Sequence, residues 1–283
     1  MRIGIGLPSG IPGVRGDLVV RWAEEVEAAP FSSLAVIDRV AYDSYDPLIA
    51  LTAAAAVTRR VKLVTAILVS PLRNTVLLAK ELASLDQLSA GRLVVGFGVG
   101  AREEDYEVAG VDHRGRGSRL TEQLRALRRI WEEGEVGPPP AQPEGPPFLV
   151  GGFVEEAFAR AARYAQGYFH GGGPPRAFGR AAELARIAWR EVGRPGEPEL
   201  WGQGYFALGE GARERAIRYM RDYYAFTGPM VERIVAQLLT TPQAVVQFVE
   251  GYAEAGCDEL VLMPAVPDLD QVGRLAEAVA CVW

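Results

Sequence analysis

Short apolar runs recur along the first third of the chain, separated by longer amphipathic segments. The runs Arg2–Leu7, Ser33–Asp38, Val61–Leu68 and Leu93–Phe97 have the length and β-branched character of buried strands. They begin about 30 residues apart, which is the length of a strand–helix–strand unit. Because such a crossover returns the chain in the same direction, the pattern predicts neighbouring parallel strands.

The segments between these runs carry helix signals. Asp17–Ala29 has a helical apolar pattern, and Pro47 is suited to the first turn of the next helix. Asn74 is a suitable N-cap, and Gly91 a suitable stop, for a third helix. The apolar face of that helix is formed by Leu78, Leu82 and Leu85.

The second half of the chain is less regular, but it keeps the alternation. A proline-rich stretch, Gly137–Pro147, is predicted to be a surface loop rather than a domain boundary. Strands are predicted at Phe148–Val150, Tyr168–His170, Leu200–Leu208 and Glu259–Met263. Helices are predicted through Leu120–Trp131, from Val154, over Pro174–Glu191, Gly209–Met220 and Met230–Leu239, from Thr241 to Gly256, and through Leu269–Val279.

Eight strands interleaved with helices in 283 residues predict an α/β fold of the (β/α)8 TIM-barrel type. We expect one domain spanning residues 1–283. A doubly wound parallel sheet is the alternative architecture, and the length alone would also allow two small domains.

Composition and charge exclude several classes of partner. Acidic residues outnumber basic ones by 36 to 30, so the net charge of −6 disfavours nucleic acid and anionic membranes. No apolar stretch approaches the ~18 residues of a membrane span, and the first apolar run is too short for a signal peptide. The two cysteines, Cys257 and Cys281, lie far apart and outside any CxxC, so we expect buried thiols and a cytoplasmic location.

The stretch from Arg92 to Gly100 is the most distinctive local pattern. A strand runs into three glycines at alternate positions, Gly96, Gly98 and Gly100, which predicts bare backbone against which a flat ligand could lie. The pair Gly151-Gly152 lies between a strand and a helix N-terminus. It is suited either to binding phosphate or to a tight turn.

Other candidate residues follow strands, where barrel active sites lie. Asp38 and Arg39 follow the second strand; Asp38 could bind a heterocycle or pair with an arginine. His170 ends the sixth strand and is either a cavity residue or a structural histidine. HExxH, CxxC and the G-x-S-x-G elbow are all missing from the sequence, so we expect no dedicated metal site and no hydrolase of the elbow type.

Together these features resemble the bacterial luciferase-like monooxygenase family, and most closely its branch that uses the deazaflavin coenzyme F-420. The resemblance extends over nearly the whole chain. Its segments, in order, are Asp38, Tyr45-Asp-Pro-Leu48, Thr58-Arg-Arg-Val61, Pro71-Leu-Arg-Asn74, Ala79 to Arg92, Gly96 to Gly100, Pro147 to Gly152, and Thr241-Pro242.

The resemblance implies a flavin or deazaflavin at the mouth of the barrel. It implies that Asp38 lies near the ring system and that the Ala66–Ile67 peptide bond is cis and braces one face of the ring. Val99 and Gly100 would also line the ring. The residues implied to bind the phosphate are Gly151, Gly152 and Phe153.

Two positions depart from the family pattern. Relatives that oxidise a sugar alcohol have His where this chain has Arg39, and Glu where it has Ala101, so that particular reaction is not expected. Arg39 stays protonated and is suited to an anionic substrate or a reduced ring, which leaves His170 as the leading proton-transfer candidate. Lesser candidates are Tyr42, Asp43 and Glu103.

The implied function is a flavin-type oxidoreductase acting on a small organic molecule, either by hydride transfer with coenzyme F-420 or by monooxygenation with FMN. An FMN enzyme would receive reduced flavin from a separate reductase. Arg102 or Arg176 could meet the acidic tail of the deazaflavin, or be ordinary surface charges. The resemblance also implies a homodimer. The competing interpretations are a non-catalytic flavin-binding or partner subunit, and an aldolase or isomerase barrel.

Overall fold

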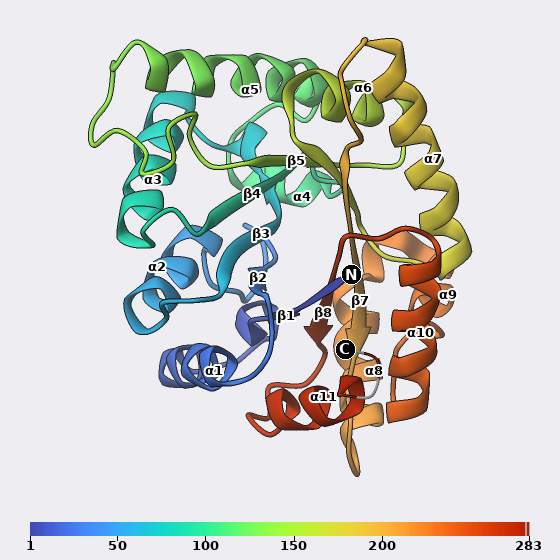
Figure 1. Ribbon diagram of the computed structural model, residues 1–283. Helices are drawn as coiled ribbons and strands as arrows, with labels where there is room; N and C mark the ends of the chain where they lie inside the picture. The colour runs from blue at the N-terminus through green and yellow to red at the C-terminus, as the bar shows by residue number, and fades with distance from the viewer. Residues whose placement is uncertain (281, 283) are drawn as a thin grey trace.

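Eight parallel strands close into a barrel in the computed structural model, which describes residues 1–280 and 282 (Figure 1). Each strand pairs with the next, and β8 pairs with β1, so the sheet has no free edge. The predicted (β/α)8 architecture is therefore confirmed. Cys281, one of the two cysteines expected to be buried, lies outside the described residues, whereas Cys257 is buried.

The strands lie within a residue or two of the predicted positions. They are β1 Arg2–Gly6, β2 Ser33–Val36, β3 Lys62–Val69, β4 Leu93–Gly98, β5 Phe148–Gly151, β6 Gly167–His170, β7 Glu199–Phe206 and β8 Glu259–Pro264.

The helices form the outer ring that Figure 1 shows around the strands. They are α1 Gly16–Ala28, α2 Pro47–Val57, α3 Thr75–Leu88, α4 Glu103–Val108, α5 Arg116–Glu132, α6 Glu155–Tyr164, α7 Pro175–Glu191, α8 Ala212–Tyr223, α9 Val231–Val235, α10 Pro242–Glu254 and α11 Gln271–Val279. Three short 3-10 turns are η1 Pro8–Gly10, η2 Ser70–Leu72 and η3 Ala225–Met230.

Two helical segments differ from the prediction. The sequence pattern did not predict α4, because its six residues are mostly acidic and carry no repeating apolar face. The helix predicted over Met230–Leu239 is limited to α9, since Leu239 leaves the helix and forms a bridge with Phe206 beside the barrel. Side chains of Asp46, Asn74 and Thr241 accept hydrogen bonds from the first backbone amides of α2, α3 and α10, respectively, and so fix where these helices begin.

Residues along each strand alternate between the helix layer and the barrel interior. On β4, Val95 and Phe97 join the core under the helices, whereas Val94 faces the interior. On β7, Trp201 and Tyr205 face the interior in the same way. This alternation decides which residues near the strand ends can reach a ligand at the mouth.

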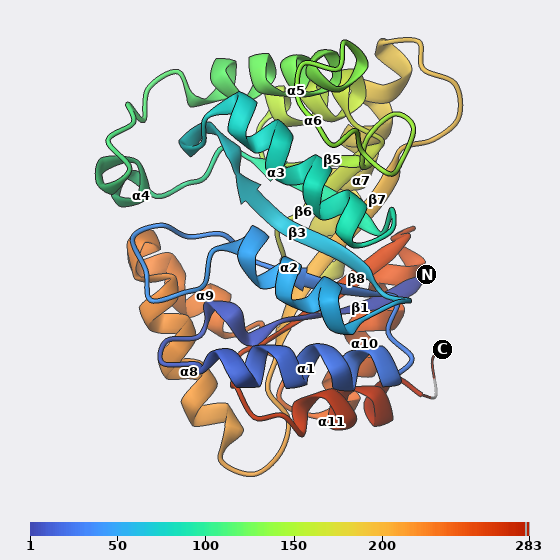
Figure 2. The ribbon, with the colours of Figure 1, turned by 90° about the vertical axis from the view of Figure 1, so that its left-hand side faces the viewer.

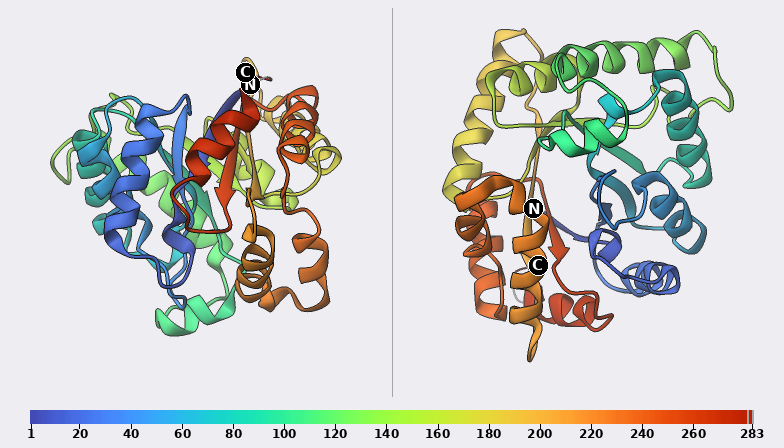
Figure 3. Two further views of the ribbon diagram at one scale, coloured as in Figure 1. Left: turned by 90° about the horizontal axis from the view of Figure 1, so that it is seen from below. Right: turned by 180° about the vertical axis from the view of Figure 1, so that it is seen from behind.

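The C-terminal ends of the strands form the functional end of such a barrel. Figure 2 shows α4 at this end, opposite the N-terminus, and α8 and α9 reach the same end. Helix α11 returns the chain beside the N-terminal strand (Figure 3, left). Within the described residues, no helix combines the length and apolarity required to cross a bilayer.

Candidate functional site

A cavity of about 360 Å3 opens between the C-terminal ends of β3 to β7. It is lined by Ala66, Ile67, Val99, Gly100, Ala101, Arg116, Gly151, Gly152, Phe153, Val154, Ala157, Arg160, Phe169, Gly171 and Gln203. Seven of the residues predicted from the sequence to hold a cofactor therefore lie together around one space: Ala66, Ile67, Val99, Gly100, Gly151, Gly152 and Phe153. We call this space the main cavity.

The glycines of β4 do not form the bare shelf expected from the sequence. A Cβ on Gly98 would lie 1.7 Å from Ile67 Cδ1, and one on Gly96 would lie 2.3 Å from the Thr65 carbonyl oxygen. The Ile67 side chain thus covers these glycines, and of the three only Gly100 lines the main cavity. Because Gly96 and Gly98 have no side chains, they leave room for Ile67 of the neighbouring strand β3. The Ile67 side chain then forms part of the cavity wall.

Ile67 reaches this position through an irregularity in β3. The pairing of β3 with β4 shifts register between Thr65 and Leu68, and the Ala66–Ile67 peptide bond between them is cis. The cis bond implied by the resemblance is therefore present. The backbone there bulges from the regular sheet, and both Ala66 and Ile67 line the main cavity.

Positive charge gathers at one end of the main cavity. Gly151-Gly152 leads into the N-terminus of α6, and Arg116 and Arg160 line the same space. Among the described residues neither arginine has an ion pair: Arg160 Nε donates to the Thr121 hydroxyl at 2.9 Å, and Arg116 Nε is buried without a partner. Glu155 and Glu156, in the first turn of α6, are exposed, and Glu156 acts electrostatically on Arg160 without forming an ion pair with it.

Gln203, on β7, brings a buried amide to the main cavity. Its Nε2 donates to the Gly171 carbonyl oxygen at 3.1 Å, which fixes the orientation of the amide because a carbonyl oxygen can only accept. The Oε1 atom is then left without a hydrogen-bond partner, although the residue is only 6% exposed. An unpaired buried acceptor beside a cavity is suited to an N–H or O–H group of a ligand.

Asp38 was predicted to lie near the ring of the cofactor, but it does not line the main cavity. Its Oδ2 accepts from the Val69 amide and from Arg73 Nη1, both at 2.8 Å, and its Oδ1 accepts from Arg73 Nη2 at 3.2 Å. Burial raises the pKa of this carboxyl, while the Arg73 guanidinium and the Val69 amide act in the opposite direction. The pairing with an arginine, one of the two alternatives, is the one observed.

Arg39 is also enclosed in ion pairs. Its Nε donates to Asp105 Oδ2 at 2.8 Å, and its Nη2 bonds to Glu104. The other Asp105 oxygen accepts from the amides of Val40 and Ala41. Arg39 therefore links the loop after β2 to α4 and does not line the main cavity.

Of the two arginines considered for the acidic tail of the deazaflavin, Arg176 is a surface charge, one of the two alternatives, whereas Arg102 has surroundings that the sequence did not predict. The Arg102 guanidinium lies 4.4 Å from the centre of the Tyr223 ring and 4.1 Å from that of Phe226, and it donates to the Tyr223 carbonyl oxygen at 2.9 Å. It is thus held by aromatic rings rather than solvated, whereas Arg176, at the start of α7, is exposed. The Tyr42 hydroxyl donates to Asp222, Asp43 accepts from the Gly13 amide, and Glu103 is exposed.

His170 faces the helix layer because it alternates with Phe169, which faces the interior of the barrel. The Tyr168 hydroxyl donates to the Gly152 carbonyl oxygen at 2.8 Å, so His170 Nδ1 must supply the proton for its own 3.2 Å bond to that hydroxyl. His170 Nε2 is then unprotonated, buried and without a partner. Burial lowers the pKa of this imidazole to about 4.

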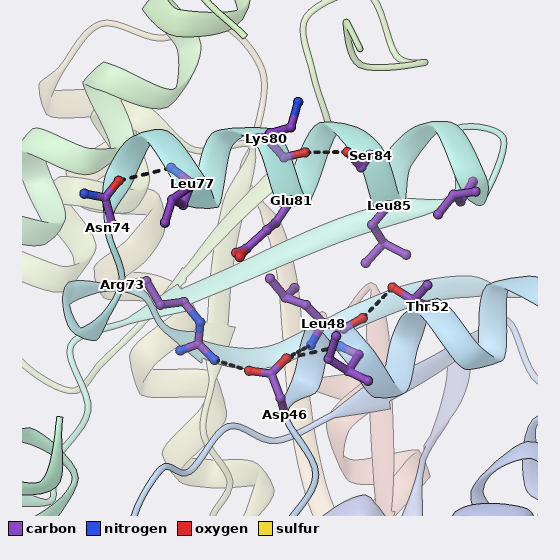
Figure 4. Close-up of a pocket in the computed structure, with 12 residues that line it drawn as sticks. Asp46, Leu48, Thr52, Arg73, Asn74, Leu77, Lys80, Glu81, Ser84 and Leu85 are labelled. Carbon is purple, nitrogen blue, oxygen red and sulfur yellow. Dashed lines mark hydrogen bonds and ion pairs between the residues drawn. The ribbon is translucent and has the colours of Figure 1, made fainter. Parts of the chain in front are cut away.

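A groove of about 590 Å3 lies outside the barrel between α2 and α3 (Figure 4). Its apolar wall includes Ile49, Leu77 and Leu88, which are 60 to 68% exposed. Acidic and basic groups border this wall, and Figure 4 shows Arg73 bonded to Asp46 at its edge and Glu81 directed into the space. Exposed apolar residues gathered in this way are typical of a contact surface.

Three polar residues of the main cavity were missed by the sequence reasoning. Gln203 had a usable signal: it is a polar residue at an inward position of an otherwise aromatic strand. Arg116 and Arg160 had no such signal in the sequence. Their helices carry other arginines that do not line the cavity, so nothing local distinguishes these two. Within residues 1–280 and 282, no three His, Cys, Asp or Glu side chains are grouped as metal ligands would be.

Comparison with known proteins identifies a family that covers most of the chain. Residues 1–259 match the family described as luciferase-like monooxygenase. An uncharacterised protein of Mycobacterium tuberculosis is 33% identical over 214 residues, which span 63% of this chain and 73% of that protein.

Two further relatives have named activities. The oxygenase component of flavin-dependent trigonelline monooxygenase from Acinetobacter baylyi is 32% identical over 151 residues, 48% of this chain and 39% of its own. A solved F-420-dependent secondary alcohol dehydrogenase, in complex with an F-420–acetone adduct, superposes with a TM-score of 0.82 over 100% of this chain and 99% of its own, at 18% identity. At that identity the second likeness shows the fold alone.

Proposed function

The chain belongs to the luciferase-like monooxygenase family, and on that premise we propose that it is an oxidoreductase that binds FMN or the deazaflavin coenzyme F-420 in the main cavity. The ring system would lie against Ala66, Ile67, Val99 and Gly100. The observation that carries the proposal is the pair Arg116 and Arg160, two arginines that form no ion pair among the described residues and that line the same cavity as Gly151-Gly152. A phosphate group would supply the negative charge that these residues lack.

The remaining cavity residues fit the same class of ligand. Flavins and deazaflavins share a ring N–H, which is the kind of donor that Gln203 Oε1 lacks. Phe153 and Val154 are 68% and 59% exposed at the cavity, and a bound ring or side arm would cover them. When bound, the cofactor supplies the hydride or oxygen chemistry, while the protein binds, orients and excludes water.

His170 and Arg39, the two catalytic candidates from the sequence, are both assigned positioning roles in this proposal, because neither lines the main cavity. The His170 ring packs edge-on against Phe153, a residue of the cavity wall, and its low pKa keeps the imidazole neutral at pH 7. Arg39 is assigned a positioning role, since its donors hold α4 through Glu104 and Asp105.

Titration of the purified protein with FMN, riboflavin and coenzyme F-420, followed by fluorescence, tests the proposal. Arg116→Gln and Arg160→Gln should each weaken FMN binding about 10- to 100-fold, the loss of one hydrogen bond to a charged group. They should leave riboflavin, which has no phosphate, nearly unaffected. Arg129→Gln, on the same helix as Arg116 but exposed and paired with Glu133, is the control.

The same titration separates the alternatives. Binding of none of the three compounds would contradict the proposal and favour a non-catalytic subunit. Consumption of oxygen with reduced FMN would assign the monooxygenase branch. In that case we propose a separate reductase as partner, by analogy with the trigonelline enzyme, which is named as an oxygenase component.

We also propose that the groove between α2 and α3 binds a second copy of this chain. Its border carries both signs of charge, Asp46 and Glu81 against Arg73 and Lys80, so it can be complementary to itself across a twofold axis. Leu77→Glu, on the apolar wall, should halve the mass measured by light scattering. Val108→Glu, equally exposed but on α4, should not.

A further inference from the structure

A second cavity, of about 250 Å3, adjoins the main cavity. It lies among the loop after β6, the end of β7 and the segment from α8 to α9. Phe153 and Gly171 line both cavities, so a ligand in one can reach a ligand in the other past these two residues. The second cavity is lined by Phe153, Gly171, Gly172, Gly173, Gly204, Tyr205, Met220, Tyr224, Phe226, Thr227, Ile234, Gln237 and Phe248.

The two cavities differ in charge. Arg116 and Arg160 line the main cavity, whereas among the residues that the structure describes no Asp, Glu, Lys, Arg or His lines the second one. Transfer of an ion from water into such an apolar space is strongly unfavourable when no opposite charge meets it. The second cavity is therefore suited to an uncharged molecule.

One hydrogen-bond donor in the second cavity lacks an acceptor. The hydroxyl oxygens of Tyr205 and Tyr224 lie 3.1 Å apart and share a single hydrogen bond. Of their two hydroxyl hydrogens, one forms this bond and the other has no acceptor among the described residues. Burial raises the pKa of both phenols, so the hydroxyls remain protonated donors.

The segment that covers this cavity is held in place from the far side of the mouth. Arg102, which follows β4, lies against the rings of Tyr223, Tyr224 and Phe226 and donates to the Tyr223 carbonyl oxygen. Tyr224 and Phe226 also line the cavity. The cavity is thus formed before any ligand enters, which reduces the entropy that a ligand would lose there.

We propose that the second cavity binds the substrate, and that the substrate is a small uncharged ketone, aldehyde or alcohol with a mainly apolar body. Its oxygen accepts the unpaired hydroxyl hydrogen of the Tyr205–Tyr224 pair, and the carbon that bears this oxygen faces the main cavity. At about 30 Å3 per heavy atom, the volume admits on the order of eight heavy atoms. This assignment rests on the proposed function, which supplies the cofactor in the main cavity.

The test uses three probes with the same number of heavy atoms, cyclohexanone, methylcyclohexane and cyclobutanecarboxylate, with and without FMN. The chain has four methionines, and Met220 is buried on the wall of the second cavity. Its methyl NMR signal, assigned with Met220→Leu, reports binding. Cyclohexanone should shift this signal at the lowest concentration, methylcyclohexane at a higher one, and cyclobutanecarboxylate at none.

Variants identify the site and the donor. Tyr205→Phe combined with Tyr224→Phe should weaken cyclohexanone binding five- to tenfold and leave methylcyclohexane unchanged. Ile234→Trp, which fills the second cavity, should abolish binding of both probes and leave the FMN titration unaltered. Carboxylate binding as tight as that of the ketone, or ketone binding that survives Ile234→Trp, would overturn the assignment. A protein that binds cyclohexanone but neither cofactor would instead contradict the proposed function alone.

Discussion

The side chain of Ile67 occupies the space that a side chain on Gly98 would need: a Cβ there would lie 1.7 Å from Ile67 Cδ1 and 3.0 Å from Cγ1. The two residues come from neighbouring strands, β3 and β4, and the chain between them contains α3. A glycine in one strand therefore determines how far a side chain of the other extends along the cavity wall.

Gly98→Ala should push Ile67 into the main cavity. Because Cδ1 ends a flexible side chain, we expect a modest loss of about 1 kcal/mol in the free energy of unfolding and a cofactor Kd raised about tenfold. Urea unfolding and fluorescence titration measure the two effects. Adding Ile67→Val, which removes Cδ1, should restore most of the affinity; an unchanged Kd in the single variant would contradict this account.

Asp38→Asn should destabilise the protein strongly. The change leaves the partly buried Arg73 guanidinium with Asp46 as its remaining carboxylate partner, and loss of the buried Asp38 carboxylate from this pair is expected to remove about 3 kcal/mol from the free energy of unfolding. Urea unfolding at pH 7 measures this. Asp17→Asn is the control: it breaks the exposed ion pair with Arg15 and should leave the urea midpoint unchanged.

Asp105→Ala should loosen α4 and the loop after β2 together. The carboxylate holds Arg39 and the amides of Val40 and Ala41, so we expect about 3 kcal/mol of destabilisation and faster hydrogen exchange at those two amides. Glu104→Gln, which removes only the half-exposed partner of Arg39, should have a much smaller effect. Equal effects of the two variants would argue against this network.

His170 should make the protein less stable as the pH falls from about 6.5 to 4. The folded-state pKa of about 4 lies below the ordinary value of 6.5, so in this window the unfolded chain binds the proton and the folded chain does not. Stability therefore rises with pH, by up to about 3 kcal/mol across the window. His170→Phe should make the urea midpoint nearly independent of pH in this window. Tyr168→Phe, which keeps the imidazole, should leave the pH dependence of the midpoint unchanged.

Much of the fold could be predicted because its signals are local. The spacing of the apolar runs and the caps at Asn74 and Thr241 depend on neighbours in sequence, and they predicted eight strands and most helices near their observed positions. Helix α4 was missed because its acidic residues are held by Arg39, a contact made across 66 positions of the chain. No local pattern contains such a contact.

The sequence by itself determined that strand ends with glycines would meet at one end of a barrel, and its resemblance to a known family added the seven residues that surround the main cavity. Tertiary structure alone decided what each of them faces. It placed Ile67 over Gly96 and Gly98, turned His170 into the helix layer, and brought Arg116, Arg160 and Gln203 to the cavity from three separate elements. The physical reason is that side-chain direction and charge pairing depend on strand alternation and on partners far along the chain, which hydrophobic periodicity does not record.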